Sequence, residues 1–296
     1  MRGRLLCLSC TVRVAYDIAT KSTDDEELQK RIVTETIRWL AENPDILEEN
    51  PTFFHTYVSR LARRLTGNSD PFKPLKKASN EIALRVVPVL ERQYREKDAD
   101  EGFRLAALGT ICGNSIDFEV EGYKVSVENL ECSLLNCLKG TFAADDTAKL
   151  MAALSKARKV LYLLDNAGEI AFDKFFIKVI TEKYPVKVVA AVKEAPILND
   201  ATMEDALQVN LGEAAEVITT GSDHIGLRLE EASEEFLAHL READLIIAKG
   251  QGNYESMSGT ERRIRKPVAY ILRAKCGVVA DALGVPQHGN VVKLVT

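Results

Sequence analysis

Acidic and amide side chains follow a short apolar run near the middle of the chain. Residues 160–164 (VLYLL) are all apolar, and the run ends at an acid, an amide, a glycine and a second acid, from Asp165 and Asn166 to Glu169. A run of this length is typical of a buried strand, and the apolar residues after it recur at helical spacing. A single polar residue here could simply cap the next helix. The whole set together favours a ligand site.

Side chains of the same kinds stand at the ends of three further apolar runs. These are Asn199 with Asp200, Lys249 with Asn253 and Glu255, and Lys275. Because the carboxyl ends of parallel strands lie on one edge of a sheet, we expect these groups to converge on one crevice. Carboxylate and amide oxygens suit a hard divalent ion that also holds phosphate. Lysines beside them need an anion to offset their charge, so the combination favours phosphoryl chemistry over hydride transfer.

Sequence motifs of other enzyme classes do not account for these groups. The turn that begins at Lys249 (KGQG) is not a Walker A motif, because GxxxxGK[ST] does not occur in the chain. The turn after residue 164 lacks the GxGxxG spacing of dinucleotide-binding proteins, and there is no GxSxG nucleophile elbow. His224 and His288 each stand without an identified partner, so we expect surface or packing roles for both.

The elements that position these groups alternate between strand and helix from about residue 146. Strands separated by helical segments imply a parallel, doubly wound α/β sheet in residues 146–296, and residues 1–145 are predicted to be mostly helical. The chain is expected to close with an edge strand at 290–295. The other expected elements are strands at 160–164, 186–192, 216–221, 245–248 and 268–272, and a helix at about 229–242.

One helix of the amino-terminal region is expected to end at the segment GNSID, which carries Asn114 and Asp117. An amide and an acid three residues apart near a helix end are compatible with ordinary turn chemistry. They are also compatible with a contribution to the site. The pattern alone slightly favours the turn.

Composition limits the classes of function. The chain has 296 residues, 46% of them hydrophobic and 28% charged, with a net charge of −5. This is the balance of an ordinary globular protein, and it gives no general affinity for nucleic acid or acidic membranes. No apolar run approaches the ~20 residues of a membrane helix, and no signal peptide is recognised. We expect a cytoplasmic protein that is a monomer or a small homo-oligomer.

Six cysteines in a chain of this size do not indicate a disulfide scaffold. Cys7 and Cys10 form a lone CxxC motif, and Cys132 and Cys137 form a looser pair. A zinc site normally needs two close-spaced pairs, or one pair with histidines. Two hypotheses follow: an incidental CxxC, or a four-thiolate site made by both pairs.

Several segments together resemble the DUF89 family of metal-dependent damage-control (ARMT1-like) phosphatases. They are DNAGE at Asp165, PILNDAT at Pro196, KGQGNYES at Lys249, the GNSID segment, LRAKC and the amino-terminal CLSC. The resemblance runs along nearly the whole chain, and the CxxC is similar to that of the subfamily found in archaea and related microbes. It implies a Rossmann-like αβα sandwich with a helical amino-terminal region. It also implies hydrolysis of small phosphate esters, such as sugar phosphates or damaged phosphometabolites, with Mn, Ni, Co or Mg.

The resemblance also implies roles for single residues. Asp165, Asn166 and Asp200 would hold the metal, while Lys249 and Asn253 would contact the substrate phosphate. The remaining motif positions, expected on the substrate side of the site, are Asn114, Asp117, Glu169, Glu255 and Lys275.

The route of phosphoryl transfer stays open at this point. Transfer to water would use the metal and the charge of Lys249, whereas Asp165 or Asp200 could instead act as a nucleophile through a phosphoaspartate. The alternative from another class is a non-catalytic metal-binding or metabolite-binding protein, or a thiol redox sensor that depends on Cys7 and Cys10.

Overall fold

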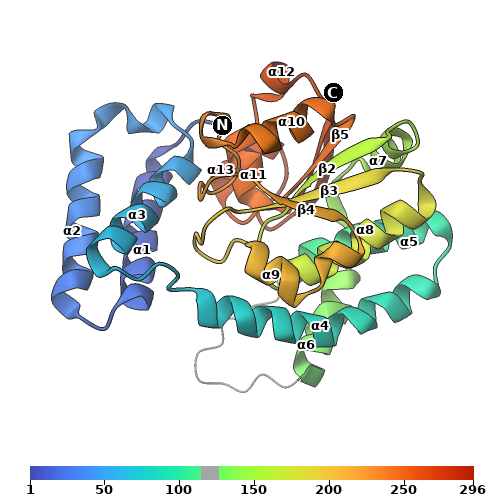
Figure 1. Ribbon diagram of the computed structural model, residues 1–296, viewed down its shortest axis with the longest axis horizontal. Coiled ribbons are helices and arrows are strands. Elements are labelled where there is room, and N and C mark those ends of the chain that lie inside the picture. Colours follow the sequence, from blue (N-terminus) through green and yellow to red (C-terminus); the bar gives the residue numbers. More distant parts are fainter. Residues whose placement is uncertain (115–126) are drawn as a thin grey trace.

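The computed structural model describes residues 1–114 and 127–296, and Figure 1 shows a layered α/β body with a group of helices beside it. In the part described, the sheet has seven strands in the order β1-β7-β6-β5-β2-β3-β4. The predicted fold class, α/β with a doubly wound sheet and a helical amino-terminal region, is confirmed. The strands are β1 (Phe142–Asp145), β2 (Lys159–Leu163), β3 (Lys187–Val192), β4 (Glu216–Thr219), β5 (Leu245–Lys249), β6 (Val268–Arg273) and β7 (Asn290–Val295).

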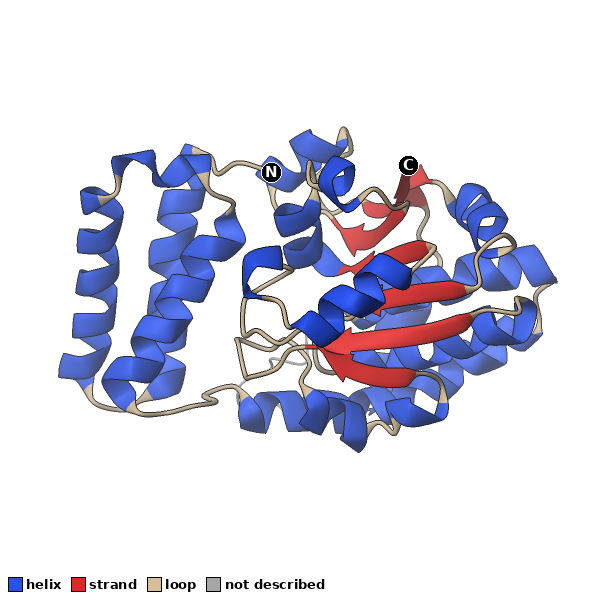
Figure 2. Cartoon of the chain, turned by 45° about the horizontal axis from the view of Figure 1, so that its top comes forward, coloured by secondary structure: helices blue, strands red, loops and turns tan. Residues whose placement is uncertain are grey.

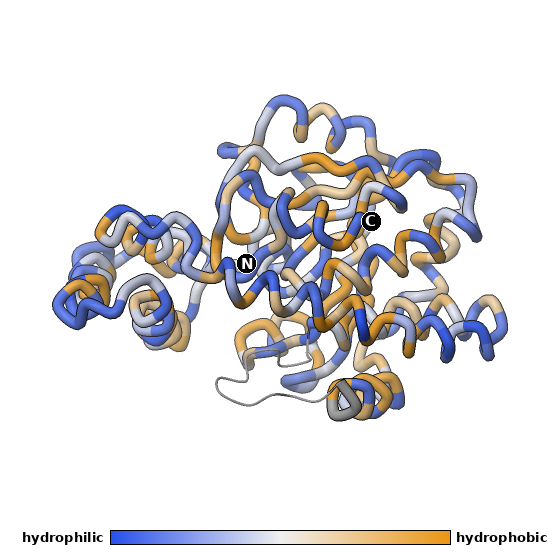
Figure 3. Tube along the Cα trace, turned by 60° about the horizontal axis from the view of Figure 1, so that its bottom comes forward, coloured by the Kyte–Doolittle hydropathy of each residue, from blue (hydrophilic) through white to orange (hydrophobic). Residues whose placement is uncertain are grey.

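Helices cover both faces of the sheet. Strand side chains alternate between two apolar cores, so that Val160 and Tyr162 belong to one core and Leu161 and Leu163 to the other. Figure 3 shows hydrophobic residues concentrated along these inner elements. The first core is covered by α4 (Lys73–Arg95), α5 (Ala99–Gly113), α6 (Val127–Leu138), α7 (Thr147–Leu154), α8 (Glu169–Lys183) and α9 (Met203–Gln208). The second is covered by α10 (Glu234–Glu242), α11 (Gly250–Met257) and α13 (Gly277–Leu283), and the short α12 (Glu261–Ile264) precedes β6.

Three further helices form a lobe beside the sheet, on the left of Figure 2. They are α1 (Leu5–Ser22), α2 (Glu26–Glu42) and α3 (Pro51–Thr66). Ile18, Ile32 and Val58 pack at the centre of the lobe. A second apolar cluster, which includes Phe54 and Val278, joins the lobe to α13. The lobe therefore packs against the segments that follow β5 and β6.

The order of the strands reverses at β2. From β2 the chain runs outward through β3 and β4 on one side, and it then crosses to β5 and β6 on the other. Leu163 near the end of β2 lies opposite Ala191 of β3 and Ala248 of β5, all in parallel register. The helices that follow β2 and β5 leave on opposite faces of the sheet, which opens a crevice between the two strand ends.

The end of the chain differs from the prediction. The expectation of an edge strand at 290–295 is wrong, because β7 lies between β1 and β6 and runs antiparallel to β6. The edge position belongs to β1, whose four residues carry no long apolar run that would have marked them. The helix expected from about residue 229 begins at Glu234, where the Ser233 side chain accepts a hydrogen bond from the Phe236 amide and caps it.

The cysteines do not form a four-thiolate site. Cys137 of α6 is bonded to Cys112 of α5 in a disulfide, so it is not available as a thiolate ligand. Cys132 is exposed on α6, whereas Cys7 and Cys10 lie together on α1. The four-thiolate hypothesis is therefore wrong. Within the described ranges, no helix has the length and apolar character needed to cross a bilayer.

Candidate active site

The ends of β2 and β5 bring the predicted acid and the lysine–glycine turn together. Asp165 follows β2 by two residues, Lys249 is the last residue of β5, and Gly250 begins α11. Gly250 has a φ of +76°, and a Cβ atom placed on it would lie 1.8 Å from Oδ2 of Asp165. Only glycine combines this backbone conformation with such a close approach to the carboxylate.

Asn114 is the hydrogen-bonding centre of the site. From the end of α5, its Nδ2 donates to Oδ2 of Asp165 at 2.8 Å and also to the carboxylate of Glu169. Its Oδ1 accepts from Nζ of Lys275 at 2.6 Å and from Nδ2 of Asn166 at 3.2 Å. Four of the predicted site residues thus meet at one amide, and Asn114 lies in the site rather than only in a turn.

The loop after β3 brings Asp200 to the same place. A short antiparallel bridge pairs Asn166 with Asp200, and the main-chain N–H of Ala201 donates to the carbonyl of Asp165 at 2.8 Å. Asp200 is only 4% exposed, and its Oδ2 accepts no hydrogen bond from the described residues. Burial raises the pKa of Asp200 to about 7. A buried carboxylate oxygen without a donor is suited to contact a cation.

The cation nearest to Asp200 is Lys193, which the sequence interpretation missed. Its Nζ lies 3.6 Å from Oδ2 of Asp200 and donates to the carbonyl of Gly226. Lys193 is buried, and burial lowers its pKa. The sequence contained a signal for Lys193. This lysine directly follows the apolar residues of β3, just as Lys249 directly follows the apolar residues of β5.

The oxygen atoms at this edge fit a hard divalent cation. Nδ2 of Asn166 donates to Asn114 and Asp165, which leaves Oδ1 of Asn166 without a hydrogen bond from the described residues. No three His, Cys, Asp or Glu side chains in the described ranges form a ready ligand cluster. The candidate oxygen ligands at this edge are the two carboxylates of Asp165 and Asp200 and the amide oxygen of Asn166. In sites of this kind, water and substrate oxygens complete the coordination shell.

Lys249 lies beneath this edge in a buried ion-pair network. Its side chain is fully buried, and Nζ contacts the carboxylate of Glu169 and, at 3.1 Å, that of Asp173. The hydroxyl of Tyr162 also donates to Asp173 at 2.6 Å. Burial lowers the pKa of Lys249, but Asp173 and Glu169 outweigh it and raise the pKa above its usual range. The structure thus places Lys249 below the crevice rather than facing it.

The pKa values of the two acids in this network are raised as well, in both cases mainly by burial. Burial raises the pKa of Glu169 above its usual range, although Lys249, which pairs with its carboxylate, opposes the shift. Asp173, which the sequence interpretation did not name, lies four residues after Glu169 and hence one turn further along α8. Two acids four residues apart on a mostly apolar helix were the sequence signal that could have identified Asp173.

Asn253 supports the backbone of the site. Its Nδ2 donates to the carbonyls of Leu164 at 3.1 Å and of Lys249 at 2.8 Å, so both amide hydrogens are used within the protein. These bonds fix the first turn of α11 against the end of β2. Both side-chain donors of Asn253 thus point to main-chain oxygens, whereas the sequence interpretation expected a contact with phosphate.

Other predicted residues lie outside the cluster around Asn114. Glu255 is buried further along α11, where it accepts a hydrogen bond from Nε2 of Gln251 at 2.8 Å, and burial raises its pKa to about 7. Asp117 lies outside the described residues. His224 is buried, which lowers its pKa to about 4, and His288 is exposed on the loop before β7.

Known proteins resemble this chain along almost its full length. The family model of the damage-control phosphatase ARMT1-like domain matches residues 5–291. The chain belongs to this family. Membership confirms the resemblance drawn from the DNAGE, PILNDAT and KGQGNYES segments, and it supports a phosphatase role for this chain.

Relatives with similar sequences come from archaea. An uncharacterized protein of Methanocaldococcus jannaschii, MJ0202, is 42% identical over 290 residues, which cover 97% of this chain and 93% of the relative. A damage-control phosphatase of Archaeoglobus fulgidus is 36% identical over 293 residues, covering 98% of each chain. The crystal structure of the DUF89 family protein PH1575 of Pyrococcus horikoshii superposes with a TM-score of 0.88 at 34% identity, over 99% of this chain and 98% of that one.

Proposed function

We propose that this ARMT1-like protein is a metal-dependent phosphatase that hydrolyses small phosphorylated metabolites. The observation that carries the proposal is Oδ2 of Asp200, a buried oxygen in the loop bridged to Asn166. It accepts no hydrogen bond from the described residues and lies 3.6 Å from Nζ of Lys193. Oxygen ligands at the point where strand order reverses suit Mn, Ni, Co or Mg and a phosphate bound with it. The substrate would be a phosphate monoester such as a sugar phosphate or a damaged phosphometabolite.

Asp165, Asn166 and Asp200 would hold the metal. When bound, such an ion offsets charge on the phosphoryl oxygens as a Lewis acid. Asn114 would orient the Asp165 carboxylate through its 2.8 Å hydrogen bond. Lys275 is exposed and has no acidic partner among the described residues, so its ammonium group would meet the charge of the bound phosphate.

Lys249 and Asn253 would act on the phosphate site mainly through their neighbours. Lys249 offsets the charges of Glu169 and Asp173, and it thereby fixes Glu169 against the amide of Asn114. A direct contact between Lys249 and phosphate would require Nζ to turn away from one of these carboxylates. Asn253 would hold the turn after β5 in place by its bonds to the backbone.

Two routes of phosphoryl transfer fit this arrangement. In the first, water attacks the phosphorus and the bond from phosphorus to the ester oxygen breaks, which releases the alcohol and inorganic phosphate. In the second, a carboxylate oxygen of Asp165 or Asp200 attacks the phosphorus and expels the alcohol, and water then hydrolyses the phosphoaspartate to inorganic phosphate and the free carboxylate. Acid quench after mixing with a radiolabelled phosphate ester separates the routes, because label stays on the protein only in the second.

A phosphatase screen across phosphorylated metabolites tests the proposed function. Chelation should abolish the release of phosphate, and addition of Co, Ni, Mn or Mg should restore it. Full activity in a rigorously metal-free preparation would show that the metal assignment is wrong. Cys7 and Cys10, on which the thiol-sensing alternative depends, are both free thiols.

A further inference from the structure

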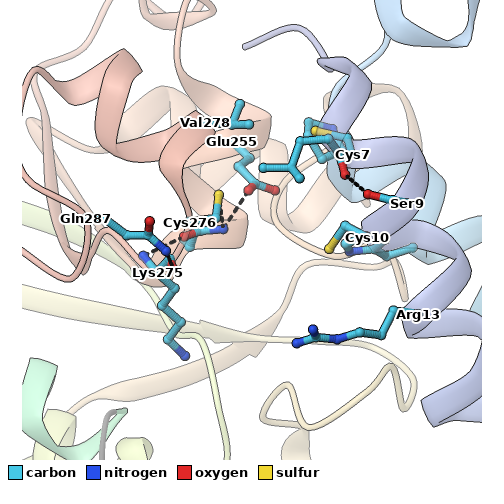
Figure 4. Close-up of a pocket in the computed structure, with 13 residues that line it drawn as sticks. Cys7, Ser9, Cys10, Arg13, Glu255, Lys275, Cys276, Val278 and Gln287 are labelled. Atoms are coloured by element: carbon cyan, nitrogen blue, oxygen red, sulfur yellow. Dashed lines mark hydrogen bonds between the residues drawn. The ribbon is translucent and has the colours of Figure 1, made fainter.

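A pocket of about 480 Å³ lies between α1 of the lobe and the turns that follow β5 and β6. Figure 4 shows residues of α1 on one side of it and residues of the sheet domain on the other. Its apolar lining comes from Leu6, Pro51 and Val278, and its thiols from Cys7, Cys10 and Cys276. Burial raises the pKa of Cys7 and of Cys10, so both remain neutral thiols at pH 7. Much of the wall is therefore compact and uncharged.

The pocket begins where the candidate active site ends. Lys275 lines the pocket, and its Nζ donates to Asn114, the residue that also holds Asp165. Gln251, another lining residue, accepts a hydrogen bond from the main-chain N–H of Lys275 at 3.0 Å and follows Gly250 directly in α11. A ligand with a phosphate at the metal edge would extend naturally into this space.

Two cations line the pocket without an acid to neutralise them. Figure 4 shows the guanidinium of Arg13 and the ammonium of Lys275 extending from opposite sides toward the same part of the pocket. Within the described ranges, neither side chain lies within ion-pair distance of an Asp or Glu, and both are exposed. Among the described residues of the lining, the one acid is Glu255, which is buried and has its pKa raised to about 7. An anion between Arg13 and Lys275 would complete the pocket electrostatically.

We propose that this pocket binds the organic part of the phosphorylated substrate, and that Arg13 pairs there with a second acidic group of the same molecule. The inference rests on the proposed phosphatase function and narrows its substrate class to phosphate monoesters that carry a second phosphate or a carboxylate. The thiols and apolar side chains contact the carbon skeleton. Lys275 lies between the two anionic groups, and Arg13 is a specificity-determining residue supplied by the lobe.

Matched pairs of substrates test this assignment. Fructose bisphosphate is compared with fructose monophosphate for a second phosphate, and phosphoglycerate with glycerol phosphate for a carboxylate. The quantity measured is the ratio of kcat/KM within each pair. The wild-type ratio should exceed one in at least one pair, and Arg13→Gln should lower that ratio about tenfold, the loss expected for one charge-assisted contact. Arg13→Lys should retain part of the preference, because it keeps the charge.

A control variant and an independent substrate make the outcomes distinguishable. Arg38 is an exposed arginine of α2 outside the pocket, so Arg38→Gln should leave the ratios at their wild-type values. General damage by Arg13→Gln would lower kcat/KM for both members of a pair and would leave the ratio unchanged. An unchanged ratio, or no preference in either pair, overturns the pocket assignment. Failure of the wild type to hydrolyse nitrophenyl phosphate with any of the four metals would overturn the phosphatase proposal itself.

Discussion

The amide nitrogen of Asn114 lies 2.8 Å from the carboxylate of Asp165, although 51 residues separate them in the sequence. The bond joins the last turn of α5 to the loop after β2. Because the same amide also contacts Glu169 and Lys275, the orientation of a predicted metal ligand depends on a helix that packs on the sheet. Residues from both halves of the chain therefore build the site.

Asn114→Ala should lower kcat/KM by about 10- to 100-fold and should weaken metal binding. Asp165 would lose a hydrogen-bond donor that orients its carboxylate. Loss of a hydrogen-bond partner of a metal ligand typically lowers metal affinity or activity by about 10- to 100-fold. Steady-state kinetics and calorimetric metal titration on the same samples provide the measurement. Wild-type turnover in Asn114→Ala would contradict the central role of this amide.

Asp165→Asn and Asp200→Asn should each reduce metal affinity and turnover together, by more than about a hundredfold in rate. The amide keeps the size of the carboxylate but removes the charge that a divalent ion requires. Asp24→Asn, at an exposed position between α1 and α2, serves as the control and should change neither quantity. Metal affinity retained in either site variant would show that the ligands are wrongly assigned.

Lys249→Met should destabilise the fold by about 3–5 kcal/mol, because it leaves Glu169 and Asp173 buried without their cation. Urea unfolding gives the free energy directly. Adding Glu169→Gln and Asp173→Asn to the same chain should recover much of the loss, since no unpaired charge then remains. Lys77→Met, at an exposed lysine of α4, should leave the midpoint unchanged. Equal midpoints for Lys249→Met and the wild type would argue against the buried network.

Glu255→Gln should change how stability depends on pH. Burial raises the pKa of Glu255 from 4.5 to about 7, so between these values the folded state keeps a proton that the unfolded chain has lost. The contribution of Glu255 to the free energy of unfolding therefore falls as the pH rises from 4.5 to about 7. The free energy of unfolding of Glu255→Gln, measured relative to the wild type, should therefore rise by on the order of 2–3 kcal/mol between pH 4 and pH 8. Unfolding in urea at both pH values measures the gain, and exposed Glu42→Gln should show none.

Gly250→Ala should abolish most turnover, because its Cβ would occupy the space of the Asp165 carboxylate and the φ of +76° disfavours alanine. Gly212→Ala is the matched control, since nothing lies within 4 Å of a Cβ at that position. Comparison of kcat for the two variants checks the expectation. An active Gly250→Ala enzyme would mean that α11 can move away from Asp165 without loss.

The strand-end residues were predictable because their apolar runs are short, uninterrupted and buried. Parallel pairing then required Asp165, Asp200 and Lys249 to lie on one edge, without any knowledge of the loops. The pairing of parallel strands did not predict how deeply each of these side chains is buried. Lys249 points into the core because two acids of α8 face it, and this packing depends on where the helix lies over the sheet.

The rest of the site depends on contacts between distant segments. Asn114 ends a helix in a segment compatible with an ordinary turn, and its contact with Asp165 forms only when α5 packs against α8. Arg13 reaches its pocket because the lobe folds back on the turns after β5 and β6. Strand β1 was not predicted for a related reason. Its four residues have no apolar run of their own, and they form a strand because they pair with β7.

The hydrogen bond between Lys275 and Asn114 spans 161 positions of the chain. In an unfolded chain these groups are far apart, so a ligand that contacts both recognises only the folded state. Its binding free energy then adds to the stability of the fold by mass action, by about 2.7 kcal/mol at a hundredfold excess over Kd. Thermal unfolding of the intact protein is thus itself an assay for ligands, in which metals and phosphorylated compounds can be ranked by the rise in Tm without any turnover.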